Sequence, residues 1–254
     1  DGGNLSVGGT SKLLADRGGD PLNITLNSDL NEFTGALEVA GNEVLIAASS
    51  AVVLADVSAL SLNFSTSDTL TNTANAPIDV IGNATLRAAS MDLGGQTGAT
   101  LKAASFTLNS DGLARLTNTI DTLFAGQSTV GSLELISRGS INDQDEGVAT
   151  LIVTGQTTLT AQEVDETLHA ITLDNGNDFG GALNVLAAES LRINDVNTLQ
   201  LGNISVPEAE LTANDMITNV AGAQVIVDQQ LTLSSASAYL GGQNGDRLEI
   251  GLLN

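Results

Sequence analysis

The second of two related stretches in this chain reads Ile171-Thr172-Leu173-Asp174-Asn175-Gly176-Asn177-Asp178-Phe179-Gly180-Gly181-Ala182-Leu183-Asn184-Val185. The first reads Ile24-Thr25-Leu26-Asn27-Ser28-Asp29-Leu30-Asn31-Glu32-Phe33-Thr34-Gly35-Ala36-Leu37-Glu38-Val39. Both contain a short alternating segment, a polar turn, an acidic residue before Phe, and Gly-Ala-Leu-x-Val. A chain that repeats itself at a long interval is interpreted first as a repeat architecture, because the repeat decides the fold.

The spacing between the two copies is nearly constant. Ile24 and Ile171 are 147 residues apart, whereas Phe33 and Phe179 are 146 apart, so the polar turns differ by one residue. Later matches keep the spacing of 147, above all Leu93-Gly94-Gly95-Gln96 and Leu240-Gly241-Gly242-Gln243. We therefore predict one repeat unit over residues 4–149 and a second, incomplete one over residues 150–254.

Between these matches, apolar residues alternate with polar ones over three to five positions, as at Val44/Ile46 and Val52/Leu54. Alternation with a period of two predicts half-buried strands. Short strands at this spacing occur in antiparallel sandwiches and in solenoids. Hairpin pairs such as Asn175-Gly176 are rare here, and the alternation continues without a linker, which favours the solenoid.

The predicted fold is therefore all-β: a single parallel β-helix (β-solenoid) over residues 1–254. At about 20 residues per coil, the chain would make about 12 coils, each pairing its strand edges with the next. Leu, Ile and Val would stack inward, while Ser, Thr, Asn and charged side chains face out. Phe33 and Phe179 occupy equivalent repeat positions, so we expect them in the core or in a cap.

Charge and composition exclude several classes of function. The 254 residues include 30 acidic and 8 basic ones, for a net charge of −22, which argues against nucleic acid or an anionic membrane as a partner. The absence of cysteine excludes disulfides and thiolate metal sites. We find no apolar run long enough for membrane insertion. Because the sequence begins at Asp1, we expect a processed product or a piece of a longer chain.

Acidic turns are the candidate metal sites. Hard oxygen ligands suit Ca²⁺, and the weak candidates are Asp143, Asp145 and Glu146, then Asp174 with Asp178, and Asp246. Asp246 follows Gly241-Gly242-Gln243-Asn244-Gly245, which approximates a calcium-roll repeat, but the equivalent of Asp246 in the first copy is Ala99. A glycine turn is therefore the favoured interpretation, and we expect no cofactor, with Ca²⁺ as the one ion these turns could hold.

No catalytic constellation is evident. His169 is the only histidine, and no cysteine could partner it, so we expect a turn or surface residue. Parallel β-helices that cleave polysaccharides need a carboxylate cluster, usually with Arg or Lys, in a groove. The sequence shows no distinctive carboxylate pair, and we predict that the chain is not an enzyme and has no catalytic residue.

The pattern Asn177-Asp178-Phe179-Gly180-Gly181, with its copy around Glu32-Phe33, resembles the repeats of filamentous-haemagglutinin-type bacterial exoproteins. The resemblance extends over nearly the whole chain. It implies a right-handed parallel β-helix and a secreted or cell-surface protein of cell adhesion. Partners would then be glycans or proteins of a host cell, a neighbouring cell or the matrix.

Three functions remain open at this stage. The first is a rigid, non-catalytic shaft segment of a secreted or surface-attached adhesin. The second is a self-assembling subunit of an extracellular filament, sheath or surface layer, because uncapped solenoid ends expose strand edges that can pair end to end. The third is a polysaccharide-active enzyme, which would require a carboxylate cluster on one outer face.

Overall fold

The structure is a computed structural model that describes residues 3–144 and 150–253. The chain divides into two compact units, Asp1–Ile120 (unit 1) and Asp121–Asn254 (unit 2). The described residues form strands and no helix, so the all-β prediction is confirmed. In that part of the chain no helix has the length and apolar character needed to cross a membrane.

The strands of unit 1 are β1 (Ser6–Val7), β2 (Ser11–Leu14), β3 (Asp16–Arg17), β4 (Asp20–Pro21), β5 (Ile24–Leu26), β6 (Glu32–Phe33), β7 (Ala36–Ala48), β8 (Val52–Thr66), β9 (Thr69–Asn72), β10 (Pro77–Ala88), β11 (Ser90–Leu93) and β12 (Thr100–Asn118). Those of unit 2 are β13 (Thr122–Phe124), β14 (Gln127–Ser137), β15 (Ile141–Asp143), β16 (Thr150–Val153), β17 (Thr157–Ala161), β18 (Ile171–Phe179), β19 (Leu183–Ala187), β20 (Ser190–Asp195), β21 (Leu199–Ala213), β22 (Met216–Asn219), β23 (Gln224–Ser234), β24 (Ser237–Tyr239) and β25 (Arg247–Leu253).

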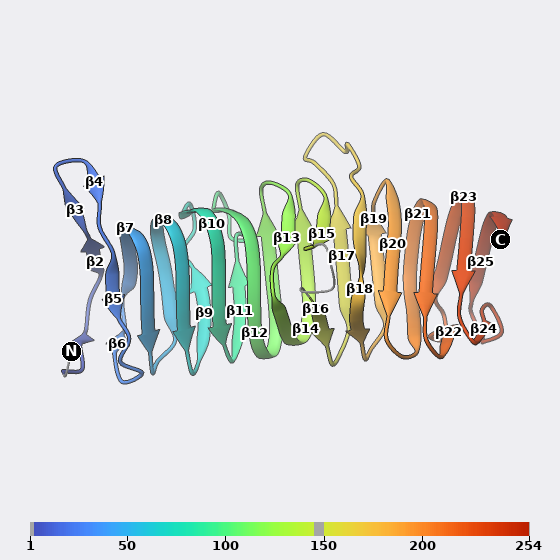
Figure 1. The fold of residues 1–254 in the computed structure, drawn as a ribbon, viewed down its shortest axis with the longest axis horizontal. Coiled ribbons are helices and arrows are strands. Elements are labelled where there is room, and N and C mark those ends of the chain that lie inside the picture. The colour runs from blue at the N-terminus through green and yellow to red at the C-terminus, as the bar shows by residue number, and fades with distance from the viewer. Residues whose placement is uncertain (1–2, 145–149, 254) are drawn as a thin grey trace. The chain divides into compact units, whose positions relative to one another are not determined.

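Unit 1 is a β-solenoid whose strands pair in parallel with strands of the preceding and following coils. β8 pairs with β7 on one edge and with β10 on the other. Leu62 of β8 lies opposite Ala84 of β10, which in turn lies opposite Phe106 of β12, so buried side chains stack in a column. The short β3–β4 pair is antiparallel and projects as a hairpin beyond its neighbours (Figure 1).

Unit 2 is built in the same way. One buried column runs through Ile171, Leu191, Ala209 and Leu231, in steps of 20, 18 and 22 residues. The described strands of the two units make about 11 coils, which confirms the predicted β-solenoid of about 12 coils. The predicted repeat boundary between residues 149 and 150 falls within unit 2 and stays a prediction.

Thin aliphatic layers form the core, as the alternation predicts, and the phenylalanines sit among them, whereas Tyr239 is 56% exposed. Phe33 is 1% exposed and Phe179 is 0% exposed, so the prediction that they pack in the core is confirmed. The alternation fails at solenoid corners. There β8 continues through Leu60 with two successive residues facing out, and Leu60 is 46% exposed although Leu62 is buried.

Two buried asparagines show how the repeat is built into the interior. The Oδ1 atom of Asn31 accepts the N–H of Leu5, and its Nδ2 donates to the carbonyl of Leu26, at 3.0 and 3.2 Å. Asn177 makes the equivalent contacts with Leu151 and Leu173, at 2.8 and 3.0 Å. A buried amide group must be hydrogen-bonded. Each of these two side-chain amides bonds the backbone of the preceding coil and the backbone of its own turn.

A turn explains the match between Leu93-Gly94-Gly95-Gln96 and Leu240-Gly241-Gly242-Gln243. Gly94 and Gly241 have φ angles of +77° and +70°, in a region that favours glycine. Their N–H groups donate to Oδ1 of Asn72 and of Asn219, at 2.9 and 3.0 Å. The recurring Leu-Gly-Gly-Gln therefore marks a turn that an asparagine of the preceding coil holds.

Replacement of Phe179 by Ala should destabilise unit 2 by about 3–5 kcal/mol, because it removes a fully buried ring from a column that cannot collapse. Guanidinium denaturation followed by circular dichroism measures the loss. Leu186→Ala is the control, since Leu186 is 55% exposed and should change stability by about 0.5 kcal/mol at most. A loss below about 1 kcal/mol for Phe179→Ala would contradict the core described here.

Candidate functional site

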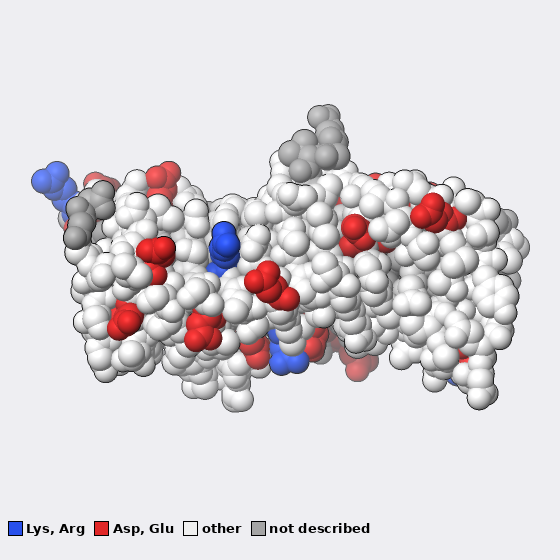
Figure 2. Space-filling model, turned by 90° about the horizontal axis from the view of Figure 1, so that it is seen from below, with Lys and Arg blue, Asp and Glu red and all other residues white. Residues whose placement is uncertain are grey.

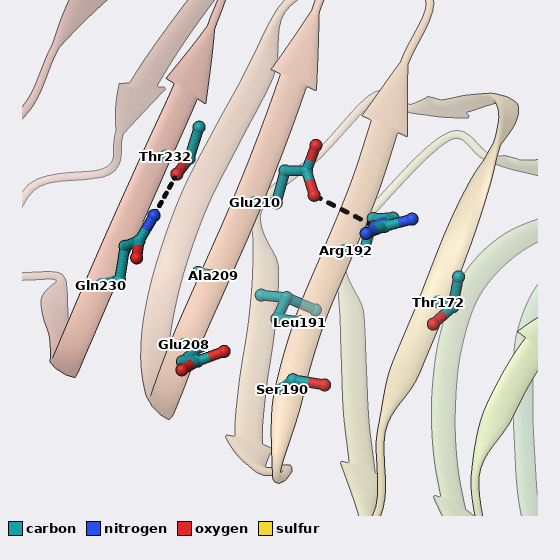
Figure 3. Close-up of a pocket in the computed structure, with 9 residues that line it drawn as sticks. All are labelled: Thr172, Ser190, Leu191, Arg192, Glu208, Ala209, Glu210, Gln230 and Thr232. Atoms are coloured by element: carbon teal, nitrogen blue, oxygen red, sulfur yellow. Dashed lines mark hydrogen bonds and ion pairs between the residues drawn. The ribbon is translucent and has the colours of Figure 1, made fainter. Parts of the chain in front are cut away.

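A hollow lies on the outer face of unit 2, where four coils place polar side chains in rows. Thr172 of β18, Arg192 of β20, Glu210 of β21 and Thr232 of β23 are lateral partners in the parallel ladder. A second row runs through Ser190, Glu208 and Gln230. Figure 3 shows both rows pointing outward from neighbouring strands. We call this surface the polar groove.

The polar groove has a volume of about 410 Å³ and is lined by these seven residues with Leu191 and Ala209. Arg192 is its one basic residue. The Nε atom of Arg192 lies 3.1 Å from Glu210, and its Nη1 atom lies 3.7 Å from Asp174 of the preceding coil. Gln230 donates a hydrogen bond to Thr232 at 3.2 Å. The groove thus offers hydroxyl, amide and carboxylate groups on a rigid frame.

These ion pairs are more than half exposed on the Arg192 side, at 56%. Water and salt screen such pairs, which contribute about 0.2–1 kcal/mol each. Their main effect is that the carboxylates of Asp174 and Glu210 neutralise the positive charge of Arg192. Glu208 adds a further negative charge to the groove. The groove is therefore net acidic and suited to a neutral or cationic ligand.

The same face of unit 1 lacks these charges. At the spacing of 147 residues, Leu45, Ser61 and Asn63 stand where unit 2 has Arg192, Glu208 and Glu210. Leu45 and Asn63 are lateral partners there, just as Arg192 and Glu210 are in unit 2. The solenoid does not need charge at these positions, so the charged groove is a local property of unit 2.

The sequence prediction missed this group. Arg192 and Glu210 are 18 residues apart, and nothing local joins them until the coil length is known. Together with Glu208 they form the kind of carboxylate and Arg cluster that the polysaccharide-active hypothesis requires on an outer face. None of the nine residues that line the groove is aromatic. The enzyme hypothesis therefore has one surface on which it can be tested.

The residues predicted as calcium candidates do not lie together in one site. Asp174 faces Arg192, whereas Oδ1 of Asp178 accepts a hydrogen bond from Asn197 at 2.9 Å. Asp145 and Glu146 lie outside the described residues. Among the residues that the structure does describe, no group of three or more acidic, His or Cys side chains could hold a metal ion. Calcium at these turns stays a prediction.

Asp143 is buried rather than displayed at a turn. Its Oδ2 atom accepts hydrogen bonds from the backbone N–H of Asn175, at 3.1 Å, and from Nδ2 of Asn177, at 3.0 Å. Burial raises the pKa of Asp143 above its ordinary value, although these hydrogen bonds oppose the shift. In this structure the carboxyl group of Asp143 holds the polar turn of β18 in place.

Asp246 closes a glycine turn, as the favoured interpretation predicts. Gly241 and Gly245 have positive φ angles, and Asp246 accepts hydrogen bonds from the N–H groups of Gly222, at 3.0 Å, and Gln243, at 2.6 Å. Desolvation opposes ionisation of Asp246, but its hydrogen bonds outweigh that effect and lower its pKa.

His169 lies in the connection that leads to β18, which confirms its prediction as a turn or surface residue. Its backbone N–H donates to the carbonyl of Ala161, and its Nε2 atom lies 3.7 Å from Glu163. The equivalent contact in unit 1 joins Leu22 to Ala15. His169 therefore occupies a structural position that a leucine fills in the other copy.

One buried carboxyl group was not singled out from the sequence. Asp195, at the end of β20, is 0% exposed, and its two oxygens accept the N–H groups of Phe179 and Asn197 at 2.9 and 2.8 Å. Burial raises its pKa despite those hydrogen bonds, and the neighbouring charge of Asp178 raises it further. In unit 1 the equivalent residue is Ala48, which is 3% exposed.

Comparison with known proteins adds one family. A model described as "Repeats of unknown function (DUF5649)" matches residues 1–40 and 111–186. The two matched segments end 146 residues apart, which is also the spacing of Phe33 and Phe179. No match was found among curated proteins or among solved structures. The chain is thus similar to a repeat family, and the match carries no activity or ligand with it.

The raised pKa of Asp195 makes the stability of unit 2 depend on pH. The contribution of a carboxyl group with a raised pKa is fully present below its unfolded-state pKa and is lost as the pH rises through the folded-state pKa. Asp195→Asn removes this titration. The stability of the variant relative to the wild type should therefore increase from acidic to neutral pH, as measured by guanidinium denaturation across that range.

The reciprocal variant Ala48→Asp is the matched control, because it places a carboxyl group at the equivalent buried position of unit 1. It should lose stability relative to the wild type over the same pH interval. Parallel stability curves for the wild type and Asp195→Asn would show that Asp195 is not desolvated in the folded chain.

Proposed function

We propose that this chain is a rigid, non-catalytic shaft segment of a secreted or surface-attached bacterial adhesin. The observation that supports the proposal is the parallel pairing of long strands from one coil to the next within each unit. β8 and β21 illustrate it, since both are 15 residues long and both pair on their two edges. Each coil is bonded along its length to its neighbours, so bending would strain many hydrogen bonds at once.

The surface suits a structural role of this kind. Figure 2 shows Asp and Glu side chains separated by uncharged residues on the face it presents, with few Lys and Arg. Lateral pairs between coils, such as Lys12 with Glu38 at 2.8 Å and Lys102 with Asp79 at 3.6 Å, match opposite charges. Glycans or proteins of another cell surface or of the matrix are the partners that an adhesin implies.

A second candidate is an end-to-end subunit of an extracellular filament, sheath or surface layer. β25 pairs with β23 along one edge, and no described strand pairs with its other edge. Leu252 and Leu253 of β25 are 55% and 60% exposed. A strand edge beside exposed apolar side chains is a template for pairing with a further strand, and in this second candidate a second copy of the chain provides that strand.

Pulling on the two ends of a single chain by force spectroscopy should peel coils one at a time. A solenoid coil contacts only its neighbours, so its stability is a sum of local terms. Each coil of roughly 20 residues should release about 7 nm of chain. Release of an entire unit in one low-force step would contradict the shaft.

Sedimentation velocity over a range of concentrations separates the two candidates. A passive shaft keeps one sedimentation coefficient at every concentration. A filament subunit shows a rising coefficient, and replacing Leu252 and Leu253 by Lys should abolish the rise, because charge on a strand edge blocks pairing.

A further inference from the structure

Unit 1 carries an exposed apolar surface that neither candidate function uses. Leu14 of β2, Leu60 of β8 and Ile81 of β10 are 64%, 46% and 69% exposed. The three side chains line one groove of about 290 Å³, together with Pro21 and Ala40 among others. We call Leu14, Leu60 and Ile81 the apolar corner.

The corner geometry holds these side chains in place. A Cβ atom at Gly82 would lie 2.9 Å from the carbonyl oxygen of Leu60, so only glycine permits the observed approach of the two coils. The neighbouring residues Ala59 and Val80 are lateral partners in the ladder. Leu60 and Ile81 therefore follow buried partners on adjacent coils and turn outward at the same corner.

The fold does not require apolar residues at these positions. In unit 2 the equivalent positions are occupied by Thr160, Pro207 and Asp228. The equivalence is structural as well, since Leu14 lies opposite Ala40 just as Thr160 lies opposite Ala187. The same scaffold is thus built with Thr160 and Asp228 in place of Leu14 and Ile81, and the exposed apolar side chains of unit 1 are a separate feature that a binding role explains.

The charge around the corner selects the kind of partner. Asp16 lines the groove of the apolar corner. An adjoining groove of about 360 Å³ shares Ala40 and Ser58 with it and is lined by Glu38, Asp56 and Asp79. Glu38 pairs with Lys12 and Asp79 with Lys102, so Asp56 and Asp16 leave the two grooves net acidic. The chain as a whole has a charge of −22. A second copy of the chain and an anionic lipid surface are both repelled, whereas a cationic partner is attracted.

We propose that the apolar corner of unit 1 is the docking site of a cationic, amphipathic polypeptide segment of another protein. Apolar side chains of that segment cover Leu14, Leu60 and Ile81, and its Lys or Arg side chains face Asp16 and the acidic residues of the adjoining groove. A concave surface suits a peptide better than a membrane, which would need an apolar face that projects. The proposal does not depend on whether the chain is a shaft or a filament subunit.

The test uses the full chain and a fluorescent peptide of alternating Leu and Lys as the probe, with binding followed by fluorescence anisotropy. The wild-type chain should bind the probe saturably, and more tightly at low salt than at physiological salt. The double variant Leu14→Thr, Ile81→Asp introduces the residues that unit 2 has at these positions. It should bind about tenfold more weakly, as expected for the loss of one large apolar contact.

This variant separates apolar docking from simple charge attraction. Ile81→Asp adds a negative charge, so a purely electrostatic contact would become tighter. Leu186→Asp is the control, because it also removes an exposed leucine and adds a charge, but in unit 2. It should leave the affinity within about twofold of the wild type, since surface substitutions away from a contact have small effects. Circular dichroism checks that both variants are folded.

Three results would overturn the proposal. The first is equal or tighter binding of the probe by the double variant, which would make the contact electrostatic only. The second is the absence of saturable binding by the wild-type chain, or equal binding of a Leu and Glu peptide. The third is a wild-type dimer that the double variant converts to monomer, which would make a second copy of the chain the occupant.

Discussion

Parallel hydrogen bonding between successive coils is the constraint on which the rest of this structure depends. A coil alone leaves the N–H and C=O groups of both strand edges unpaired, and only the next coil can satisfy them. The need to stack fixes the register, and the register in turn fixes which side chains share a column. The buried column through Ile171, Leu191, Ala209 and Leu231 and the outward row through Thr172, Arg192, Glu210 and Thr232 are two faces of one ladder.

The same constraint explains why polar groups occur inside the solenoid. Turns interrupt the ladder and expose backbone groups, which Asn31 and Asn177 satisfy from buried positions with the same set of contacts. Asp195 likewise accepts hydrogen bonds from the N–H groups of Phe179 and Asn197, and its carboxyl group is buried as a result. Because Ala48 fills the equivalent position in unit 1, the scaffold accommodates either residue, and a titrating carboxyl group at this position occurs in unit 2 alone.

The sequence contained enough information for the fold but little for the site. Period-two alternation and the repeat at 147 residues can both be found in the sequence without knowledge of the coil length. They were therefore enough to predict the strands, the burial of Phe33 and Phe179, and the glycine turn before Asp246. The polar groove joins residues 18 to 22 positions apart, and the coil length varies from step to step. The apolar corner joins Leu60 to Ile81, 21 positions later, and to Leu14, 46 positions earlier. Leu60 fits the apolar alternation and yet faces out, because a corner places two successive residues on the outside. Surface sites on a solenoid thus become visible only when the register is known.

Disulfide trapping measures that register directly, and the absence of native cysteine makes it unambiguous. Thr85 and Thr107 are lateral partners in unit 1, as are Gln200 and Thr218 in unit 2. Lateral partners are about 5 Å apart, within the range for a disulfide, whereas Thr85 and Asn109 are offset by one further pair of residues. The account predicts rapid intramolecular cross-linking of the cysteine pairs 85–107 and 200–218 and none of the pair 85–109. Cross-linking of 85–109 in preference to 85–107 would contradict the parallel ladder on which every surface described here depends.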